Sequence, residues 1–524
     1  MTTYDAVIIG SGFGGTMAAH TLVHAGQRVL MLERGNWVRR GLHNWQGEQV
    51  GLLGEHYATE SPYVVHTERG RSTAGAFHCV GGPSVFYGGV ALRFREEDFE
   101  SNPDLDRDSG AAWPFAYGDL EPYYTAAERI IGVAGVAGED PTEPRRSQPY
   151  AEPPEQLSEV SSRIAGSARA LGFHPFRLPL AINYGAAPGR RSCLACGTCD
   201  GFACAIGAKN DLATSVLPGL IERGLELRPH TVAVRLLADG DWVTEVVCAD
   251  ARTGERTVYR ARHIVLAGGA IGSPHLILTS GLHRYNPGGH VVGRYLMRHL
   301  NRIVFGVFPQ SSAGSGQFQK QIGIHDLYFG DHEGNGPRGK LGAIQQIGTP
   351  PPELVRQQLA GPLGLLGARV VEHLAGLLTI AEDQPQFENR VVPDRTRTDR
   401  FGLPLLHLSH RYTARDRDAS SALMRAARAV LRRSGAWAFY QHQIGTFSHA
   451  VGTVRMGRDP RTSALDRHGR FRGLANLLVL DGSFMPRSSG VNPSLTIAAN
   501  ALRCAAVLVG DTPRPKRSHV LLAR

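Results

Sequence analysis

A strand, a glycine-rich turn and a helix at the N-terminus limit the fold of this chain more than any other feature. The β-branched run at residues 6–9 leads into the glycine turn at residues 10–15, which fits G-x-G-x-x-G, and residues 16–25 have helical character. A second apolar run over residues 28–32 ends at Glu33. This order predicts a βαβ unit that opens a parallel, Rossmann-like sheet.

The glycines of this turn predict a dinucleotide site. Gly10 permits the tight turn, Gly12 lets the backbone approach a pyrophosphate, and Gly15 lets helix and strand pack closely. Free N–H groups at the start of the helix would then meet the phosphates. The carboxylate of Glu33 can accept hydrogen bonds from ribose hydroxyls and would repel a 2′-phosphate. By itself the turn leaves FAD and NAD both open.

Composition indicates an ordinary soluble globular protein, and the length indicates two to four domains or one large composite domain. The chain has 524 residues, 63 of them glycine, with 42% hydrophobic and 20% charged residues. The net charge is +10, yet no compact basic block is present, so no nucleic-acid partner is expected. The most apolar stretch, residues 363–380, is interrupted by Arg369, Glu372 and His373, and no membrane span is expected. Because the chain shows no signal peptide, we expect a cytoplasmic location.

Further elements can be placed along the chain. Short buried strands are expected at residues 263–267 and 477–480, and two strands with a turn within residues 225–251. Residues 413–434 predict an amphipathic helix and residues 494–509 a closing helix. Glycine-rich loops are expected over residues 70–90.

Four other segments resemble the glucose–methanol–choline (GMC) oxidoreductases, which are FAD-dependent alcohol oxidases and dehydrogenases. The matching stretches lie in order along nearly the whole chain, at residues 80–89 (VGGPSVFYGG), 269–282, 292–299 (VGRYLMRH), and 449–457 with 480–483 and 490–497. The resemblance is closest to bacterial members that act on sterols, sugars and aminoglycoside alcohols.

The resemblance implies a composite α/β fold. A Rossmann-like FAD-binding domain would be assembled from the discontinuous segments 1–95, 190–300 and 446–512. A substrate-binding domain with an antiparallel sheet would come from residues 96–189 and 301–445, and residues 513–524 would form a flexible tail.

The resemblance also implies a catalytic pair, His449 and Asn492. An alcohol gives up hydride to flavin N5 only as its hydroxyl proton is removed, and His449 would be the base that takes this proton. Asn492 would orient the substrate oxygen without titrating. The expected activity is oxidation of a CH–OH group on a small-molecule sugar, glycoside or polycyclic alcohol, with O2 or another electron acceptor.

Residues expected to hold FAD fall in the matching segments. They are Gly10, Ser11, Gly12, Phe13, Gly14, Gly15, Glu33, Arg34, Gly81, Gly82, Ser84, Tyr87, Gly88, Gly89, Ala233, Gly268, Asp481, Gly482, Asn492, Pro493 and Ser494. Some relatives attach FAD covalently to a histidine in the glycine loop. The matching residue here is Phe86, so the flavin is expected to be non-covalent.

A cysteine cluster lies in a segment where some members of the resembling family also have cysteines, and a few sugar dehydrogenases among them are associated with an iron–sulfur cluster. Cys193, Cys196, Cys199 and Cys204 are spaced C-x2-C-x2-C-x4-C. The first three resemble an iron–sulfur ligand run, with the fourth one residue late for the ferredoxin pattern. The same four cysteines could instead bind zinc. A third alternative is that they are free thiols or disulfides that shape a loop.

Two other functions stay open on sequence alone. An electron-transfer flavoprotein subunit would use an iron–sulfur cluster at this cysteine loop to pass electrons to a partner. A NAD-dependent dehydrogenase would use the same N-terminal turn, although the C-terminal return of the chain argues against it.

Overall fold

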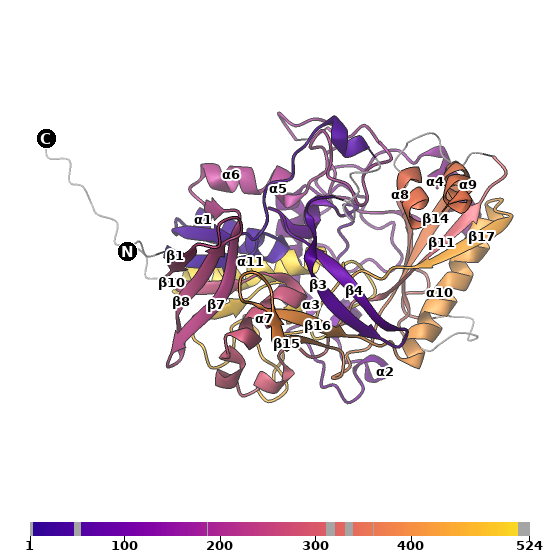
Figure 1. Ribbon diagram of the computed structural model, residues 1–524. Coiled ribbons are helices and arrows are strands. Elements are labelled where there is room, and N and C mark those ends of the chain that lie inside the picture. Colours follow the sequence, from indigo (N-terminus) through magenta and orange to yellow (C-terminus); the bar gives the residue numbers. More distant parts are fainter. Residues whose placement is uncertain are drawn as a thin grey trace, which may run out of the picture.

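A parallel sheet at one end of the molecule carries the N-terminal turn (Figure 1). The computed structural model describes residues 4–46, 54–185, 187–310, 320–330, 339–359 and 361–511. The sheet has five strands in the order β18 (Leu477–Val479), β10 (Ala261–Leu266), β1 (Tyr4–Ile9), β2 (Val29–Leu32) and β6 (Glu226–Arg228). All four pairings are parallel. The apolar runs predicted as buried strands are confirmed, and the chain returns to this sheet from widely separated segments.

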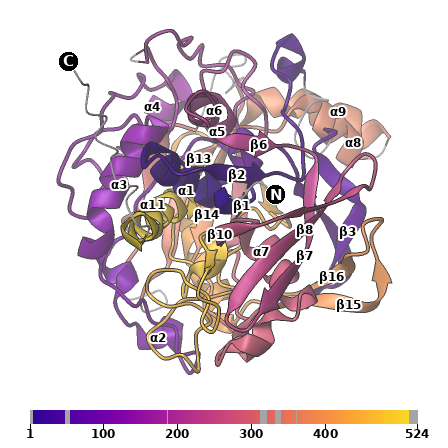
Figure 2. The ribbon, with the colours of Figure 1, turned by 90° about the vertical axis from the view of Figure 1, so that its left-hand side faces the viewer.

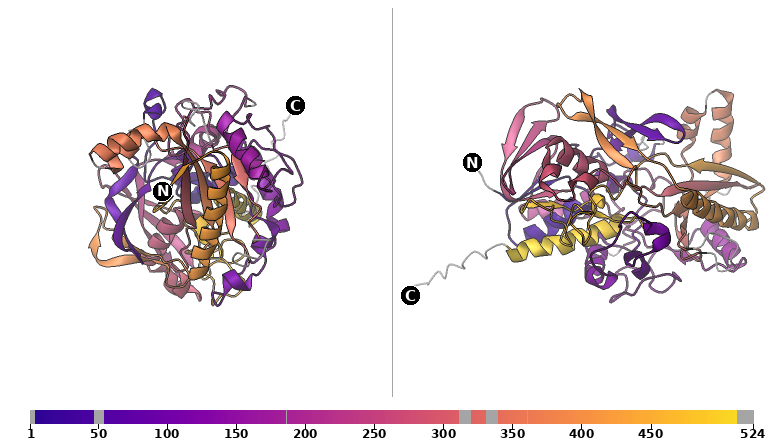
Figure 3. Two further views of the ribbon diagram at one scale, coloured as in Figure 1. Left: turned by 90° about the vertical axis from the view of Figure 1, so that its right-hand side faces the viewer. Right: turned by 90° about the horizontal axis from the view of Figure 1, so that it is seen from below.

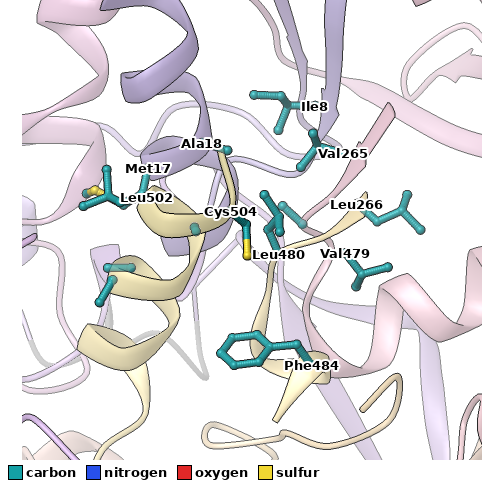
Figure 4. Packing of buried hydrophobic residues seen from close by; sticks show 14 of the residues in the cluster. Ile8, Met17, Ala18, Val265, Leu266, Val479, Leu480, Phe484, Leu502 and Cys504 are labelled. Carbon is teal, nitrogen blue, oxygen red and sulfur yellow. The ribbon is translucent and has the colours of Figure 1, made fainter. Parts of the chain in front are cut away.

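Helices cover the parallel sheet and complete its core. In Figure 2, α1 (Phe13–His24) and α11 (Ser494–Asp511) lie side by side next to β1 and β10. Helix α3 (Tyr117–Ile131) packs on α11. Figure 4 shows how Met17 and Ala18 of α1 meet Leu502 and Cys504 of α11, next to Val265 of β10. Burial of these side chains anchors the first and last parts of the chain to each other.

A six-stranded antiparallel sheet lies at the opposite end (Figures 1 and 3). Its order is β17 (Ala438–Gln443), β11 (Leu300–Val307), β14 (Leu374–Ala381), β13 (Gly342–Ile347), β12 (Ile322–Ile324) and β5 (Phe176–Arg177). Helix α10 (Ala414–Arg433) packs on β11 and β14 with its apolar side. Thr413 caps this helix by accepting the Asp416 N–H with its side chain, which confirms the amphipathic helix expected over residues 413–434.

The other described strands form two smaller sheets. One contains β15 (Arg390–Thr398), β16 (Pro404–Ser409), β3 (Tyr57–Thr67) and β4 (Gly70–Phe77), and the other β7 (Thr231–Asp239), β8 (Trp242–Asp250) and β9 (Arg256–Tyr259). The hairpin β3–β4 corrects the expected loop at residues 70–77. The remaining helices are short: α2 (Pro103–Asp106), α4 (Glu159–Arg169), α5 (Leu212–Ser215), α6 (Leu217–Glu222), α7 (Gly269–Thr279), α8 (Pro352–Gln358) and α9 (Pro362–Val370).

The expected α/β fold with an added antiparallel sheet is therefore confirmed, whereas the domain limits stay a prediction. Strands β3 and β16 pair with each other, so segments assigned to different domains share one sheet. The expected tail at residues 513–524 lies outside the described residues.

Candidate active site

The glycine turn between β1 and α1 has the geometry that its sequence predicts. Gly10 has φ of 107°, and a Cβ atom there would lie 2.4 Å from the carbonyl oxygen of Ala267. A Cβ atom on Gly15 would lie 2.0 Å from the carbonyl oxygen of Gly10. A Cβ atom on Gly12, in contrast, would meet nothing within 4 Å. The backbone at the start of α1 is thus open to an approaching ligand, and α1 has no side-chain cap for its first N–H groups.

Glu33 lies at the end of β2 and faces this turn. Its carboxylate accepts hydrogen bonds from Ser11 Oγ at 2.6 Å, from the Ser11 N–H at 3.1 Å and from the Gly35 N–H at 2.9 Å. Burial raises the pKa of Glu33, and these hydrogen bonds act in the opposite direction. The arrangement brings a strong hydrogen-bond acceptor beside the open helix terminus, as a ribose site requires.

The loop over residues 80–89 crosses the glycine turn. The Gly81 N–H donates to Ser11 Oγ at 2.9 Å, and a Cβ atom on Gly82 would lie 3.2 Å from Gly12 Cα. The rings of Phe13 and Tyr87 meet edge to face, with centroids 5.7 Å apart. Two predicted cofactor loops that are distant in sequence therefore lie against each other.

The remaining predicted cofactor residues border the same region, with one exception. A Cβ atom on Gly14 would lie 2.2 Å from the carbonyl oxygen of Leu480, next to Asp481. Asp481 accepts a hydrogen bond from the Gly269 N–H at 2.9 Å and another from Ser273 Oγ. The exception is Arg34, whose guanidinium points to Asp399, at 3.6 Å, on the β15–β16 connection.

Other residues in the predicted set are placed by their backbone. Ala233 lies on β7, whose first residue, Thr231, donates its N–H to the Glu33 carbonyl at 2.8 Å. Ser84 Oγ donates to the Gly81 carbonyl at 2.6 Å and accepts the Leu212 N–H. Of the other members, Gly482 begins a 3-10 helix directly after Asp481, and Ser494 begins α11. The rest lie in connections between elements: Gly88, Gly89, Gly268 and Pro493.

His449 and Asn492 lie side by side although they are far apart in the sequence. Nδ2 of Asn492 is 3.4 Å from Nε2 of His449. Oδ1 of Asn492 accepts a hydrogen bond of 2.7 Å from Nε2 of Gln345 on β13. An oxygen atom placed near both groups would receive a hydrogen bond from the amide and face the imidazole. The expected pair is therefore brought together, with a third side chain that sequence reasoning missed.

The surroundings keep His449 neutral. Burial lowers the pKa of His449 well below its usual value, and the neighbouring His299 and Lys320 lower it further. Lys320 is almost fully buried and forms an ion pair of 2.6 Å with Asp200. A neutral imidazole has a lone pair with which to accept a proton. No local motif marks Lys320, and only the fold reveals its place beside Gly88.

The four clustered cysteines line one pocket as free thiols. Among the described residues, no group of three or more His, Cys, Asp or Glu side chains is gathered to hold a metal ion. Burial raises the pKa of Cys193 to about 11 and that of Cys199 to about 12. The structure therefore gives no support to the expected metal ligands Cys193, Cys196, Cys199 and Cys204.

Lys209 explains why this loop lies where it does. Its buried ammonium donates hydrogen bonds to the carbonyl oxygens of Tyr87 at 2.8 Å, Cys199 at 3.0 Å and Phe202 at 2.7 Å. The cysteine loop is in this way fastened to the 80–89 loop.

In the described part of the chain, no helix is long and apolar enough to cross a bilayer.

Known proteins match this chain over nearly its full length. Residues 4–301 match the N-terminal family model of the GMC oxidoreductases, and residues 385–501 match the C-terminal one. The chain is 33% identical to paromamine 6′-oxidase of Streptomyces fradiae, covering 99% of this chain and 93% of that protein. It is 32% identical to 6′′′-hydroxyparomomycin C oxidase of Streptomyces lividus, with coverage of 99% and 93%. Pyridoxine 4-oxidase from Mesorbium loti has the same fold, with a TM-score of 0.68 at 18% identity, covering 96% of this chain and 99% of that one.

Proposed function

Because this chain belongs to the GMC oxidoreductase family and oxidises a CH–OH group with FAD, we propose that His449 and Asn492 are its catalytic pair. The observation that carries the proposal is the approach of Asn492 Nδ2 to His449 Nε2 at 3.4 Å. Both side chains are partly buried, and the polar atoms that would act on an alcohol are turned toward each other.

The residues around the glycine turn fit FAD. An open helix N-terminus suits the pyrophosphate, and the buried carboxylate of Glu33 suits the ribose of an adenosine. When bound, FAD supplies the acceptor for the hydride that leaves the alcohol carbon. The flavin is proposed to be non-covalent, since Phe86 stands at the loop position where some relatives carry a histidine, and its ring stacks on Phe77.

The protein would act on the hydroxyl group. The alcohol oxygen would accept a hydrogen bond from Asn492 Nδ2 and donate its proton to His449 Nε2. Removal of this proton lets the oxygen form a carbonyl as the C–H bond breaks, so positive charge does not build up on carbon. Gln345 would keep the amide of Asn492 turned with its N–H groups toward the alcohol, because it occupies Oδ1.

We propose an alcohol group of an amino sugar or another glycoside as the substrate. The names of the two relatives at 33% and 32% identity, which the chain matches from end to end, support this class. This proposal concerns the substrate alone. The electron acceptor, O2 or another compound, is tested separately.

A substrate panel tests this proposal. The purified holoprotein is mixed anaerobically with paromamine, with methyl glucoside and with 2-methyl-1,2-propanediol, and the flavin absorbance band is followed. We expect rapid bleaching with an amino sugar or glycoside, and oxygen uptake on admitting air would show whether O2 is the acceptor. Bleaching by the simple diol alone would overturn the substrate class, and a colourless protein that reduces NAD would overturn the proposed function.

A further inference from the structure

Among the described residues, His299 is the only side chain with a hydrogen-bond contact to Nδ1 of His449. Nδ1 of His299 lies 3.0 Å from Nδ1 of His449, and the two rings are nearly perpendicular at 84°. The two rings therefore meet through their nitrogen atoms and do not stack. Two ring nitrogens at this distance share one proton, so one of the rings must donate and the other accept.

The other nitrogen of His299 decides which ring donates. Nε2 of His299 lies 3.1 Å from the carbonyl oxygen of Ser488. A carbonyl oxygen only accepts, so His299 must carry its proton on Nε2. With one proton per ring, Nδ1 of His299 is then an acceptor, and Nδ1 of His449 is the donor. The lone pair of His449 is left on Nε2, the atom that faces Asn492.

His299 is itself held at every polar group. Its N–H donates to Asp383 Oδ1 at 3.1 Å, and its carbonyl oxygen accepts from the hydroxyl of Tyr412 at 2.8 Å. Its backbone is in the left-handed region, with φ of 61°, a conformation that persists only when the surroundings enforce it. The backbone of His299 is thus fixed, and rotation of its imidazole would break both ring contacts, to His449 and to the Ser488 carbonyl.

Asp383 holds His299 and Ser488 in place relative to each other. Its buried carboxylate also accepts from Ser488 Oγ at 2.9 Å, from the Arg298 N–H at 2.9 Å and from His410 at 3.2 Å. The same side chain thus positions the backbone of His299 and the residue whose carbonyl receives the His299 proton.

From this geometry we infer that His299 is a positioning residue that selects the proton-accepting tautomer of His449. The inference rests on the proposed function, because it assumes that His449 Nε2 takes the alcohol proton. Without His299, an isolated imidazole carries its proton on either nitrogen. A share of the enzyme would then present an N–H to the alcohol, and the ring would also be free to turn.

Two substitutions separate this role from simple packing. His299→Ala removes the acceptor, whereas His299→Asn keeps an amide oxygen near the place of Nδ1 and tolerates left-handed backbone. We expect anaerobic flavin reduction by an amino-sugar substrate to slow at least about 30-fold in His299→Ala, with an unchanged substrate dissociation constant. His299→Asn should recover most of the loss. Equal rates in the wild type and His299→Ala, or equal losses in both variants at equal FAD content, would overturn the inference.

A measurement on the unaltered protein keeps the test valid if His299→Ala fails to fold. In ¹⁵N-histidine-labelled holoprotein, the signals of His449 are those missing from His449→Asn. We expect Nδ1 of His449 to be protonated and Nε2 to be bare; the reverse pattern would overturn the inference. The proposed function fails separately, if His449→Ala reduces flavin as fast as the wild type. If only His449→Ala is slow, the catalytic role of His449 stands and the tautomer role of His299 falls.

Discussion

Gln345 on β13 donates its side-chain N–H to Oδ1 of Asn492 at 2.7 Å, across 147 residues of sequence. A carboxamide can turn either its oxygen or its nitrogen toward a ligand, and this hydrogen bond selects the nitrogen. Gln345 is fully buried, whereas Asn492 is partly buried, so the donor side of this hydrogen bond is shielded from solvent.

Replacing Gln345 by Leu should therefore lower the rate of flavin reduction by about twofold to tenfold, the value of one hydrogen bond of about 0.5–1.5 kcal/mol. Stopped-flow absorbance under anaerobic conditions measures this rate. The control is Gln346→Leu, because Gln346 points to the opposite face of the strand and accepts hydrogen bonds from Ser161 and Gln321. A larger loss of rate in Gln346→Leu than in Gln345→Leu would contradict the assignment.

The charges near His449 predict a pH dependence with a defined sign. Burial first, and then His299 and Lys320, lower the pKa of His449, so its neutral form persists into acid and activity is lost only as pH falls through that lowered pKa. Removing the cation in Lys320→Met should raise this pKa and move the acid limb of kcat/KM to higher pH. Asp200→Asn removes the partner anion of Lys320 and should move the limb to lower pH. Shifts in the same direction in both variants would be incompatible with this electrostatic account.

Stability should depend strongly on Arg93, which lies in the core with two carboxylates. Arg93 bonds Glu128 through two nitrogen atoms at 2.8 Å each and Glu121 at 3.0 Å. Arg93→Leu removes the guanidinium that pairs with both carboxylates, which costs about 3–5 kcal/mol even though Glu128 keeps its ion pair with Arg146. We expect a clear fall in melting temperature by scanning calorimetry. Arg252→Leu, which removes an exposed ion pair with Asp250, should leave it nearly unchanged; comparable losses would argue against the buried network.

The cysteine pocket should not hold iron. Among the described residues, these thiols are not gathered into a group of three or more that could hold a metal ion. We expect anaerobically purified protein to contain only traces of iron and acid-labile sulfide, with the thiols titratable after unfolding. Stoichiometric iron and sulfide that disappear in Cys196→Ser would refute this expectation and revive the electron-transfer alternative.

Local sequence patterns predict the part of the fold that binds the dinucleotide. The strands around residues 6–9, 263–267 and 477–480 are short apolar runs buried on both faces, so their composition reveals them. The hairpin β3–β4 escaped prediction because the exposed strand β4 is built from Gly, Ser, Thr and Ala, which resemble a loop.

The candidate site is predictable only in part, for a related reason. His449 and Asn492 lie in segments with a recognisable family pattern. Gln345 and Lys320 act through contacts with Asn492 and Gly88. These contacts form only when the chain around the antiparallel sheet packs against the segments that carry Asn492 and Gly88. Pairings of this kind depend on long-range topology, and no spacing in the sequence encodes them.

The central claim is that His449 takes the proton of the alcohol. Its most direct test is the rate of anaerobic flavin reduction in His449→Ala, measured at saturating substrate and at FAD content equal to the wild type. We expect this rate to fall about 100-fold or more, because general bases contribute about 10²–10⁴-fold. A wild-type rate in His449→Ala, with FAD fully bound, would contradict it.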